Sequence, residues 1–520
     1  MPRFSVLLSS LVLALPVQAV EIAGRVHDGG RGVGGVLVSN GETLVRTDAD
    51  GRYRIDVEDG QTVFVIKPPQ CALPTGEDGL PVFWRHYLPE GTPTLRYGGI
   101  APTPADASWD FALDCSVPAA APPFDVLVFG DTQVTRSEDV GYYREDIVAP
   151  ILSGRSPGRE ARFGVTLGDV VNDRLSLYPE LNAVTAQLGI PWLHAAGNHD
   201  MDFDAAHDTA SLTNFRRTYG PDTLAYEEGP VSLLVLDDVI YRPGERPAYV
   251  GGLREDQFAF LEAYLGQLPR ERLVVLAMHI PLFTPAGKRE TFRAADRERL
   301  YRLLEPFPNV LVLSAHTHVQ QHYFHGAEDG WRGASPLHEY NVGAVCGGFW
   351  GGAKDARGVP DAVMADGTPN GHALMRVEAD GGYSLRYVPA KGDPEAGLRL
   401  YGPRVLRRGA YPGVPVYANV FMGIDGDRVE MRIGDGDWTP MTRVDEPDPH
   451  VVRINLADDA AGSLRGFDRV PQAVPSTHLW RAMLPTDLAS GVHVVEVRAF
   501  DRWRGELRAQ TRYRLDDAEP

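Results

Sequence analysis

The sequence has few basic residues for its length: 51 Lys and Arg stand against 70 Asp and Glu, and the formal net charge is −19. This deficit argues against a nucleic-acid polymer as the main partner, because phosphate backbones are bound by clustered Lys and Arg. Small phosphorylated substrates are not excluded, since bound metal cations can supply positive charge locally.

Long apolar runs are also scarce. One runs from Phe4 to Leu15, and it is shorter than the ~20 residues that a membrane-spanning helix needs. Arg3 precedes this run and the small-residue pattern VQA follows it, which is typical of a secretory signal peptide over residues 1–19. A membrane anchor is the alternative. No Cys follows the run to carry a lipid, so we expect a periplasmic or secreted protein without a transmembrane segment after signal removal.

Cysteine is rare, with 3 residues in the whole chain. Cys71 and Cys115 both belong to the first segment of the chain and could pair in an oxidising compartment; two unpaired thiols are the alternative. Cys346 lies far from both in a Gly-rich stretch, and we expect a free, buried thiol there.

The hydrophobic pattern divides the 520 residues into several domains, as expected for a chain too long for one core. Residues 20–116 contain short alternating runs broken by Gly, Asp and Asn, a pattern that resembles a prealbumin-like β-sandwich. A Pro/Ala linker follows over 117–123. Residues 124–392 alternate apolar strands with helical spacing, which predicts an α/β core. Residues 393–516 alternate again and predict a second β-sandwich.

Polar side chains follow five apolar strands of the central part. Sites in α/β sheets lie outside the carboxyl ends of the strands, so we expect these segments to meet at one edge of one sheet. Carboxylate, amide and imidazole groups suit Mn, Fe or Zn, and a pair of such ions ~3.5 to 4 Å apart can clamp a phosphoryl group. The segments are VFGD-x-Q (Asp131, Gln133), VTLGDVVND (Asp169, Asp173), GNHD (Asn198, His199, Asp200), LAMH (His279) and SAHTH (His316, His318).

The ordered motifs GD-x-Q, GD-x-x-N-D, GNHD, H-x-P and A-H-T-H resemble those of the calcineurin-like metallophosphoesterases. With a β domain on each side, the chain is similar to the bacterial subgroup that has additional N-terminal and C-terminal β domains. The resemblance implies a multidomain α/β protein with a central four-layer α/β/β/α core. It also implies a hydrolase that cleaves phosphate mono- or diesters through attack of a hydroxide bridging two divalent metal ions.

The resemblance further implies a role for each residue. His199 would act as general acid or contact the phosphate, and Asn198 would help to stabilise the developing charge. Either Asp173 or Asp200 would orient His199, and the sequence does not choose between them. The implied metal ligands are Asp131, Gln133, Asp169 and His318 for the first ion, with Asp169 bridging, and Asn198, His279 and His316 for the second.

Two features leave alternatives open. Gln133 stands where the family usually has His, and its neutral amide is a weaker ligand; a non-catalytic cell-envelope binding protein with a degenerate core is therefore the alternative function. The stretch CGGFWGG over 346–352 predicts either an aromatic pocket wall at Trp350 or close backbone packing. The expected substrate is a phosphorylated small molecule or a lipid or nucleotide ester.

Overall fold

The computed structural model describes residues 19–116, 121–284 and 290–517. The predicted signal peptide, apart from Ala19, lies outside these ranges, as do residues 117–120 of the predicted linker. Within the described ranges, no helix is both long enough and apolar enough to cross a membrane.

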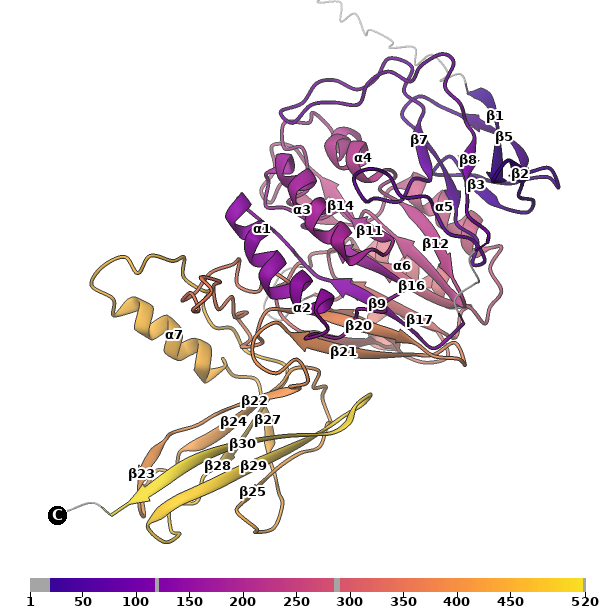
Figure 1. Cartoon of the computed structure of the whole chain (residues 1–520). Helices are drawn as coiled ribbons and strands as arrows, with labels where there is room; N and C mark the ends of the chain where they lie inside the picture. Colours follow the sequence, from indigo (N-terminus) through magenta and orange to yellow (C-terminus); the bar gives the residue numbers. More distant parts are fainter. Residues whose placement is uncertain (1–18, 117–120, 285–289, 518–520) are drawn as a thin grey trace, which may run out of the picture.

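The N-terminal part consists of two four-stranded sheets (Figure 1). Strand residues alternate between the core and solvent, as in RYRIDV of β5, where every second side chain is buried. A disulfide joins Cys71 to Cys115 and ties the end of this part to a loop that follows one sheet. The first sheet contains β1 (Val20–Asp28), β2 (Arg31–Gly32), β5 (Arg52–Val57) and β8 (Phe111–Ala112), and the second contains β3 (Leu37–Ser39), β4 (Leu44–Arg46), β6 (Thr62–Ile66) and β7 (Trp84–His86).

The central part contains two mixed sheets. The first has the order β11-β10-β9-β20-β21, with β9, β10 and β11 parallel, and the second has the order β12-β13-β16-β17-β19-β18, with β13, β16, β17 and β19 parallel. Parallel strands such as LVVLA of β16 and VLVLS of β17 are continuous apolar runs because both of their faces are covered. The strands are β9 (Phe124–Phe129), β10 (Phe163–Leu167), β11 (Trp192–Ala195), β20 (Gly371–Val377) and β21 (Tyr383–Pro389), then β12 (Leu224–Glu228), β13 (Val231–Val235), β16 (Leu273–Ala277), β17 (Val310–Ser314), β18 (Gln321–His325) and β19 (Leu337–Asn341).

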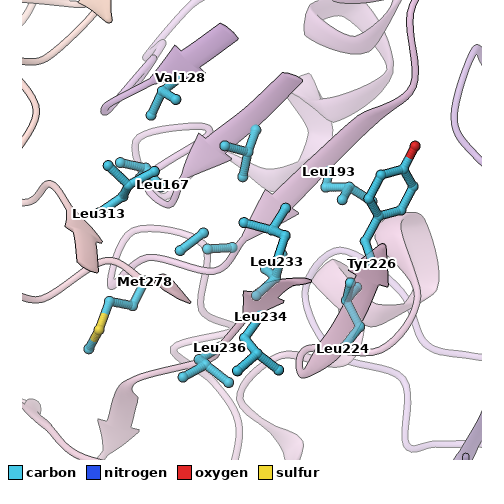
Figure 2. Close-up of a cluster of buried hydrophobic side chains, with 14 of the residues drawn as sticks. Val128, Leu167, Leu193, Leu224, Tyr226, Leu233, Leu234, Leu236, Met278 and Leu313 are labelled. Atoms are coloured by element: carbon cyan, nitrogen blue, oxygen red, sulfur yellow. The ribbon is translucent and has the colours of Figure 1, made fainter. Parts of the chain in front are cut away.

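The main core lies between these two sheets. Figure 2 shows Val128 and Leu193 of the first sheet gathered with Leu224 and Leu233 of the second. The aromatic rings of Phe163 and Tyr226 also meet across the interface, with centroids 5.2 Å apart. The sheets are therefore held together by apolar burial, and their strand ends keep a fixed relation to each other.

Helices cover the central sheets. On the side of the first sheet, α1 (Ser137–Tyr143) contacts α3 (Tyr178–Thr185), and a π-helical turn, η1 (Arg144–Val148), leads into α2 (Ala149–Leu152). Two helices lie on the second sheet, α5 (Glu255–Leu265) and α6 (Ala294–Leu304). The hydroxyl of Tyr264 in α5 donates to the carboxylate of Glu227 in β12, and the hydroxyl of Tyr301 in α6 lies 2.8 Å from Nδ1 of His325 in β18. A short helix α4 (Thr213–Tyr219) and a two-stranded ribbon of β14 (Val239–Tyr241) and β15 (Tyr249–Gly251) lie in the connections.

The C-terminal part has two more sheets and a helix that the sequence pattern did not predict. Helix α7 (Pro449–Asp459) begins at Asp448, whose carboxylate accepts from the backbone of His450 and Val451, and Pro449 occupies the first turn. Its Val451 packs on Val363 of the central part. The sheets are formed by β22 (Leu398–Tyr401), β24 (Pro415–Val420), β28 (Leu479–Met483) and β27 (Thr442–Val444), and by β23 (Val405–Arg407), β30 (Gly505–Asp516), β29 (Gly491–Asp501), β25 (Val429–Ile433) and β26 (Thr439–Pro440).

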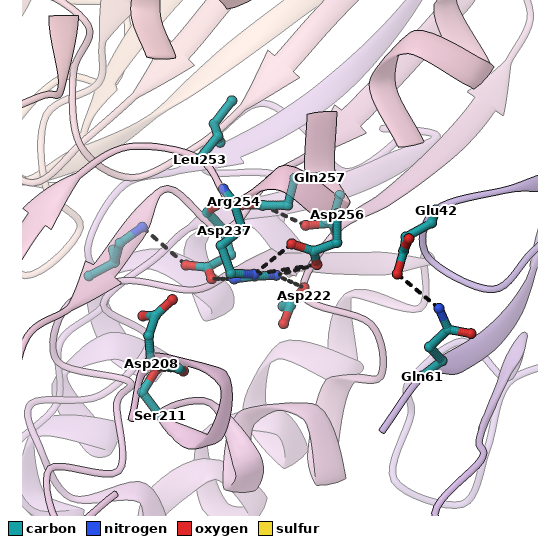
Figure 3. A network of polar contacts seen from close by, with 12 residues as sticks. Glu42, Gln61, Asp208, Ser211, Asp222, Asp237, Leu253, Arg254, Asp256 and Gln257 are labelled. Carbon is teal, nitrogen blue, oxygen red and sulfur yellow. Dashed lines mark hydrogen bonds and ion pairs between the residues drawn. The ribbon is translucent and has the colours of Figure 1, made fainter. Parts of the chain in front are cut away.

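Buried polar contacts join the three parts. Lys67, just after β6, forms a 2.9 Å ion pair with Glu228 of β12, and both side chains are buried. On the other side, His478 lies 3.0 Å from the buried Asp366. Arg216 of α4 also donates to the backbone oxygen of Gly60 in the N-terminal part over 2.6 Å. Figure 3 shows Arg254 of the central part paired with carboxylates and, apart from it, Glu42 of the N-terminal part bonded to Gln61.

Candidate metal centre

The candidate site lies where the carboxyl ends of both central sheets meet. Asp131, Asp169 and Asn198 follow β9, β10 and β11 of the first sheet, while His279 and His316 follow β16 and β17 of the second. The expectation that all five segments end at one edge of a single sheet is therefore wrong. The chain starts a second sheet after β11, and packing of the two sheets brings the strand ends together.

Asp131 and His318 form one end of the cluster. The Nδ1 atom of His318 donates to the backbone oxygen of Gly347 over 2.8 Å, which leaves Nε2 facing Oδ2 of Asp131 at 3.2 Å. The other oxygen of Asp131 accepts the backbone N–H of His316. Oδ2 is buried and receives no hydrogen bond from the described residues.

Asp169, Asn198, His279 and His316 form the other end. Nδ1 of His279 donates to the backbone oxygen of Leu167, so Nε2 faces the cluster. It lies 3.3 Å from Oδ2 of Asp169, 3.1 Å from Oδ1 of Asn198 and 3.1 Å from Nδ1 of His316. The ligand atoms of Asp169, His279 and His316 all lie within 4.8 Å of one another.

These contacts fit a bound cation. A neutral His279 that donates through Nδ1 presents a lone pair at Nε2, and the oxygen atoms of Asp169 and Asn198 that face it are also acceptors. Buried acceptors that converge in this way are costly unless a positive charge, either a proton on His279 or a metal ion, lies among them. Imidazole, carboxylate and amide oxygen are ligands that Mn, Fe and Zn accept. The donor set therefore suits divalent metal ions.

His199 and Asp173 lie at the solvent side of the cluster. Nδ1 of His199 is 2.7 Å from Oδ1 of Asp173, and the backbone N–H of His199 donates to Oδ1 of Asp169. Asp200 forms no hydrogen bond with the His199 ring. Its buried carboxylate instead accepts from Gly197 and Tyr178, so it holds the backbone of the loop.

Gln133 lies inside the cluster, but its amide nitrogen, and not its amide oxygen, faces Asp169. Its Nε2 donates to Oδ2 of Asp169 over 3.3 Å, and its Oε1 lies 3.7 Å from the thiol of Cys346. Cys346 is free and buried, as the sequence predicts, and its sulfur also lies 3.6 Å from Nδ1 of His318. A thiol beside the ligand set had no signal in the sequence pattern.

The backbone at the site is strained. Among the described residues, positive φ values outside glycine occur at eight positions, and five of these are candidate site residues: Gln133, Asp169, Asp173, His316 and His318. Such conformations persist where surrounding contacts impose them, and they cluster at functional sites. Gly197 is needed for the same close packing, because a Cβ there would lie 2.1 Å from the backbone nitrogen of Asp169.

The electrostatics of the cluster favour positive charge. Burial lowers the pKa of His279, but Asp169 more than offsets this and the pKa rises to about 10. Burial likewise opposes a charge on His199, yet its hydrogen bond to Asp173 keeps the pKa above the usual value. Burial, together with the charge of Asp169, raises the pKa of Asp200 to about 7. The carboxylates thus create a negative field at the strand ends.

Several neighbours of the cluster were not predicted from the sequence. Asp238, three residues after β13, accepts from the backbone N–H groups of His279 and Ile280; its position after a strand was a usable signal. Tyr97 of the N-terminal part donates to the backbone oxygen of Asp173 over 2.9 Å, and no local pattern indicates this. Trp350 is not an exposed pocket wall: it is buried, and its indole N–H donates to the backbone of Thr132.

Similar solved structures include a dimetal phosphatase from Danio rerio, with 15% identity, a TM-score of 0.34, and coverage of 51% of this chain and 99% of that chain. A purple acid phosphatase, PPD1, from yellow lupin (Lupinus luteus) seeds has 12% identity and a TM-score of 0.39, covering 69% and 68%. PhoD has 14% identity and a TM-score of 0.35, covering 78% and 84%.

No curated protein matches the sequence, but three family models do. The model for the N terminal of calcineurin-like phosphoesterase matches residues 20–96, the model for calcineurin-like phosphoesterase matches 124–320, and the model for the C terminal of calcineurin-like phosphoesterase matches 339–506. Matches to all three parts, in order, confirm the predicted family. The chain belongs to the calcineurin-like phosphoesterases and is a hydrolase of phosphoric ester bonds.

Proposed function

We propose that this protein is an exported, binuclear phosphoesterase that hydrolyses phosphate mono- or diesters of small molecules, lipids or nucleotides. The observation that carries this proposal is the convergence of acceptor atoms from Asp169, Asn198 and His279 on one buried point. Two divalent ions of Mn, Fe or Zn would, when bound, activate water as a nucleophile and neutralise charge on the phosphoryl group.

Each end of the cluster would hold one ion. Asp169 lies between the ends, because its Oδ2 faces both Gln133 and His279, and this position supports a bridging role. Gln133 can offer its amide oxygen only after turning away from Cys346. The first ion would be held by Asp131, Gln133, Asp169 and His318, and the second by Asp169, Asn198, His279 and His316.

His199 would donate a proton to the departing oxygen. Asp173 supports this role, since it accepts from Nδ1 and leaves Nε2 of the protonated ring available to the substrate. Asn198, which faces the cluster, would orient the phosphoryl group as well as hold a metal. Asp200 would position the loop rather than touch the substrate.

The surrounding architecture is part of the proposal. The shared core between the central sheets and the helices beside them support a four-layer α/β/β/α arrangement. The paired sheets on either side support β-sandwich domains over 20–116 and 393–516, with the catalytic domain over 124–392. Protein recovered from the periplasmic or extracellular fraction should have the mass of a chain without residues 1–19.

The test is metal analysis of the purified protein together with turnover of p-nitrophenyl phosphate and bis-p-nitrophenyl phosphate, with added Mn or Zn. We expect two metal ions per chain and cleavage of at least one ester. Asp169→Asn should lose the metal and the activity, whereas Asp106→Asn, at an exposed position of the N-terminal part, should keep both. A metal-free protein that cleaves neither ester would favour a binding protein with a degenerate core.

A further inference from the structure

Phe349 is an exposed aromatic residue that lies directly on the candidate metal centre. Its ring is stacked on the imidazole of His318, with centroids 4.3 Å apart and an interplanar angle of 28°. Phe349 is nevertheless 54% exposed. One face of the ring therefore covers a ligand side chain, while much of the residue is open to solvent beside the place where an ester would bind.

The loop around Phe349 is built to hold it there. The backbone N–H of Cys346 donates to the oxygen of Asp131, and the N–H of Trp350 donates back to Cys346. The buried indole of Trp350 is tied to Thr132. Phe349 and Trp350 both have positive φ values, of 55° and 54°, which side chains adopt only when surrounding contacts impose them. These contacts fix the position of Phe349, so its exposure does not result from a loosely held loop.

A second aromatic side chain lies on the neighbouring imidazole. Tyr249, at the start of β15, meets the ring of His316 edge to face, with centroids 6.0 Å apart. The two histidines of A-H-T-H thus each carry one aromatic neighbour, and these come from distant segments of the chain. We call Phe349 and Tyr249 the aromatic wall.

We propose that the aromatic wall selects esters whose organic group carries a flat, apolar ring, with Phe349 as the main contact. This inference rests on the proposed phosphoesterase function and specifies its substrate class. The phosphoryl group occupies the metal centre, and the ring attached to it stacks on the open face of Phe349. Aromatic pairs of this kind add to binding beyond the area that they bury.

The test compares benzyl phosphate with methyl phosphate, and benzyl methyl phosphate with dimethyl phosphate if diesters are preferred. The released alcohols have similar basicity, so a difference in kcat/KM reports on the ring and not on the chemistry of departure. We expect the wild-type protein to prefer the benzyl ester by about tenfold or more, and Phe349→Ala to reduce this preference by about tenfold. Phe349→Tyr should retain the preference, and Phe349→Leu, apolar but not flat, should lose most of it.

Binding provides an independent readout. Benzylphosphonate should bind the metal-loaded wild-type protein more tightly than methylphosphonate, and the ratio of the two Kd values should fall in Phe349→Ala but not in Val492→Ala, an exposed apolar residue on β29 of the C-terminal part. Phe349→Ala could instead lose metal and weaken binding of both phosphonates, or cleavage of both esters, by the same factor. That result would show a purely structural role for Phe349 and overturn the proposal. Preferential binding without any turnover would uphold the wall and refute the proposed function.

Discussion

The Nδ1 atom of His199 lies 2.7 Å from Oδ1 of Asp173, although the two residues follow different strands of the first central sheet. Their backbones are also joined, since the N–H of Asp173 donates to the oxygen of His199 over 3.1 Å. The pair is thus held as a unit at the solvent side of the candidate metal centre. This geometry makes Asp173, and not Asp200, the partner that can fix the orientation and tautomer of the imidazole.

Replacement of Asp173 tests this unit. Asp173→Asn should lower kcat by about 10²-fold for alkyl phosphates. Without its partner, the imidazole of His199 is poorly oriented and carries the proton that it must donate less often. The loss should be much smaller for p-nitrophenyl phosphate, whose leaving group needs little protonation. Metal content should not change. An equal loss of kcat for both substrates would contradict the general-acid role of His199. Asp106→Asn serves as the control.

Gly197 tests the packing of the strand ends. A Cβ at this position would lie 2.1 Å from the nitrogen of Asp169, so Gly197→Ala must displace a residue proposed to bridge the metals. We expect at least a tenfold loss of metal affinity, since about 1.4 kcal/mol suffices for that change. Titration of the apo protein with Mn or Zn measures it. Gly462→Ala, where a Cβ meets nothing within 4 Å, should bind metal normally.

The partly buried ion pairs of Arg254 test the stability of the central part. Arg254 pairs with Asp237, which is buried, and with Asp222 at 3.0 Å (Figure 3). Arg254→Met should lower the free energy of unfolding by about 3 to 5 kcal/mol, because it leaves a buried carboxylate unpaired. Denaturant unfolding measures this loss, and the double variant Arg254→Met with Asp237→Leu should recover part of it. For comparison, Arg52→Met removes a solvent-exposed pair with Asp50 and should cost less than about 1 kcal/mol.

The pKa of Asp366, which lies at the junction with the C-terminal part, predicts how the stability of the protein depends on pH. Burial alone would raise its pKa, but His478 and the backbone N–H groups of Gln320 and Thr368 lower it below the usual 3.8. A carboxyl group with a depressed pKa stabilises the fold above its unfolded-state pKa, and this contribution disappears as the pH falls through the folded-state value. The melting temperature of the wild type should therefore exceed that of Asp366→Asn at pH 7, and the difference should shrink below about pH 4. A difference independent of pH would refute this origin.

Much of the fold was accessible from the sequence because local patterns carry it. Continuous apolar runs such as FDVLVF predict parallel strands covered on both faces, and the runs of alternating residues at either end predict the paired sheets found there. Helix α7 was missed although Asp448 and Pro449 form a good N-terminal signal. The surrounding alternation outweighed that signal, since a helix of this length competes weakly against a pattern spread over many strands.

The sequence by itself determined the chemistry: which residue types follow the strands, in which order, and hence the family and the metal-ligand set that it implies. Tertiary structure alone decided how those residues meet. It divided the strand ends between two sheets, paired His199 with Asp173, brought Tyr97 of the N-terminal part to the site, and exposed Phe349 while burying Trp350. The physical reason is that ligand identity is a property of each side chain, whereas these contacts join residues far apart in the chain and form only when the sheets pack and the loops between them close.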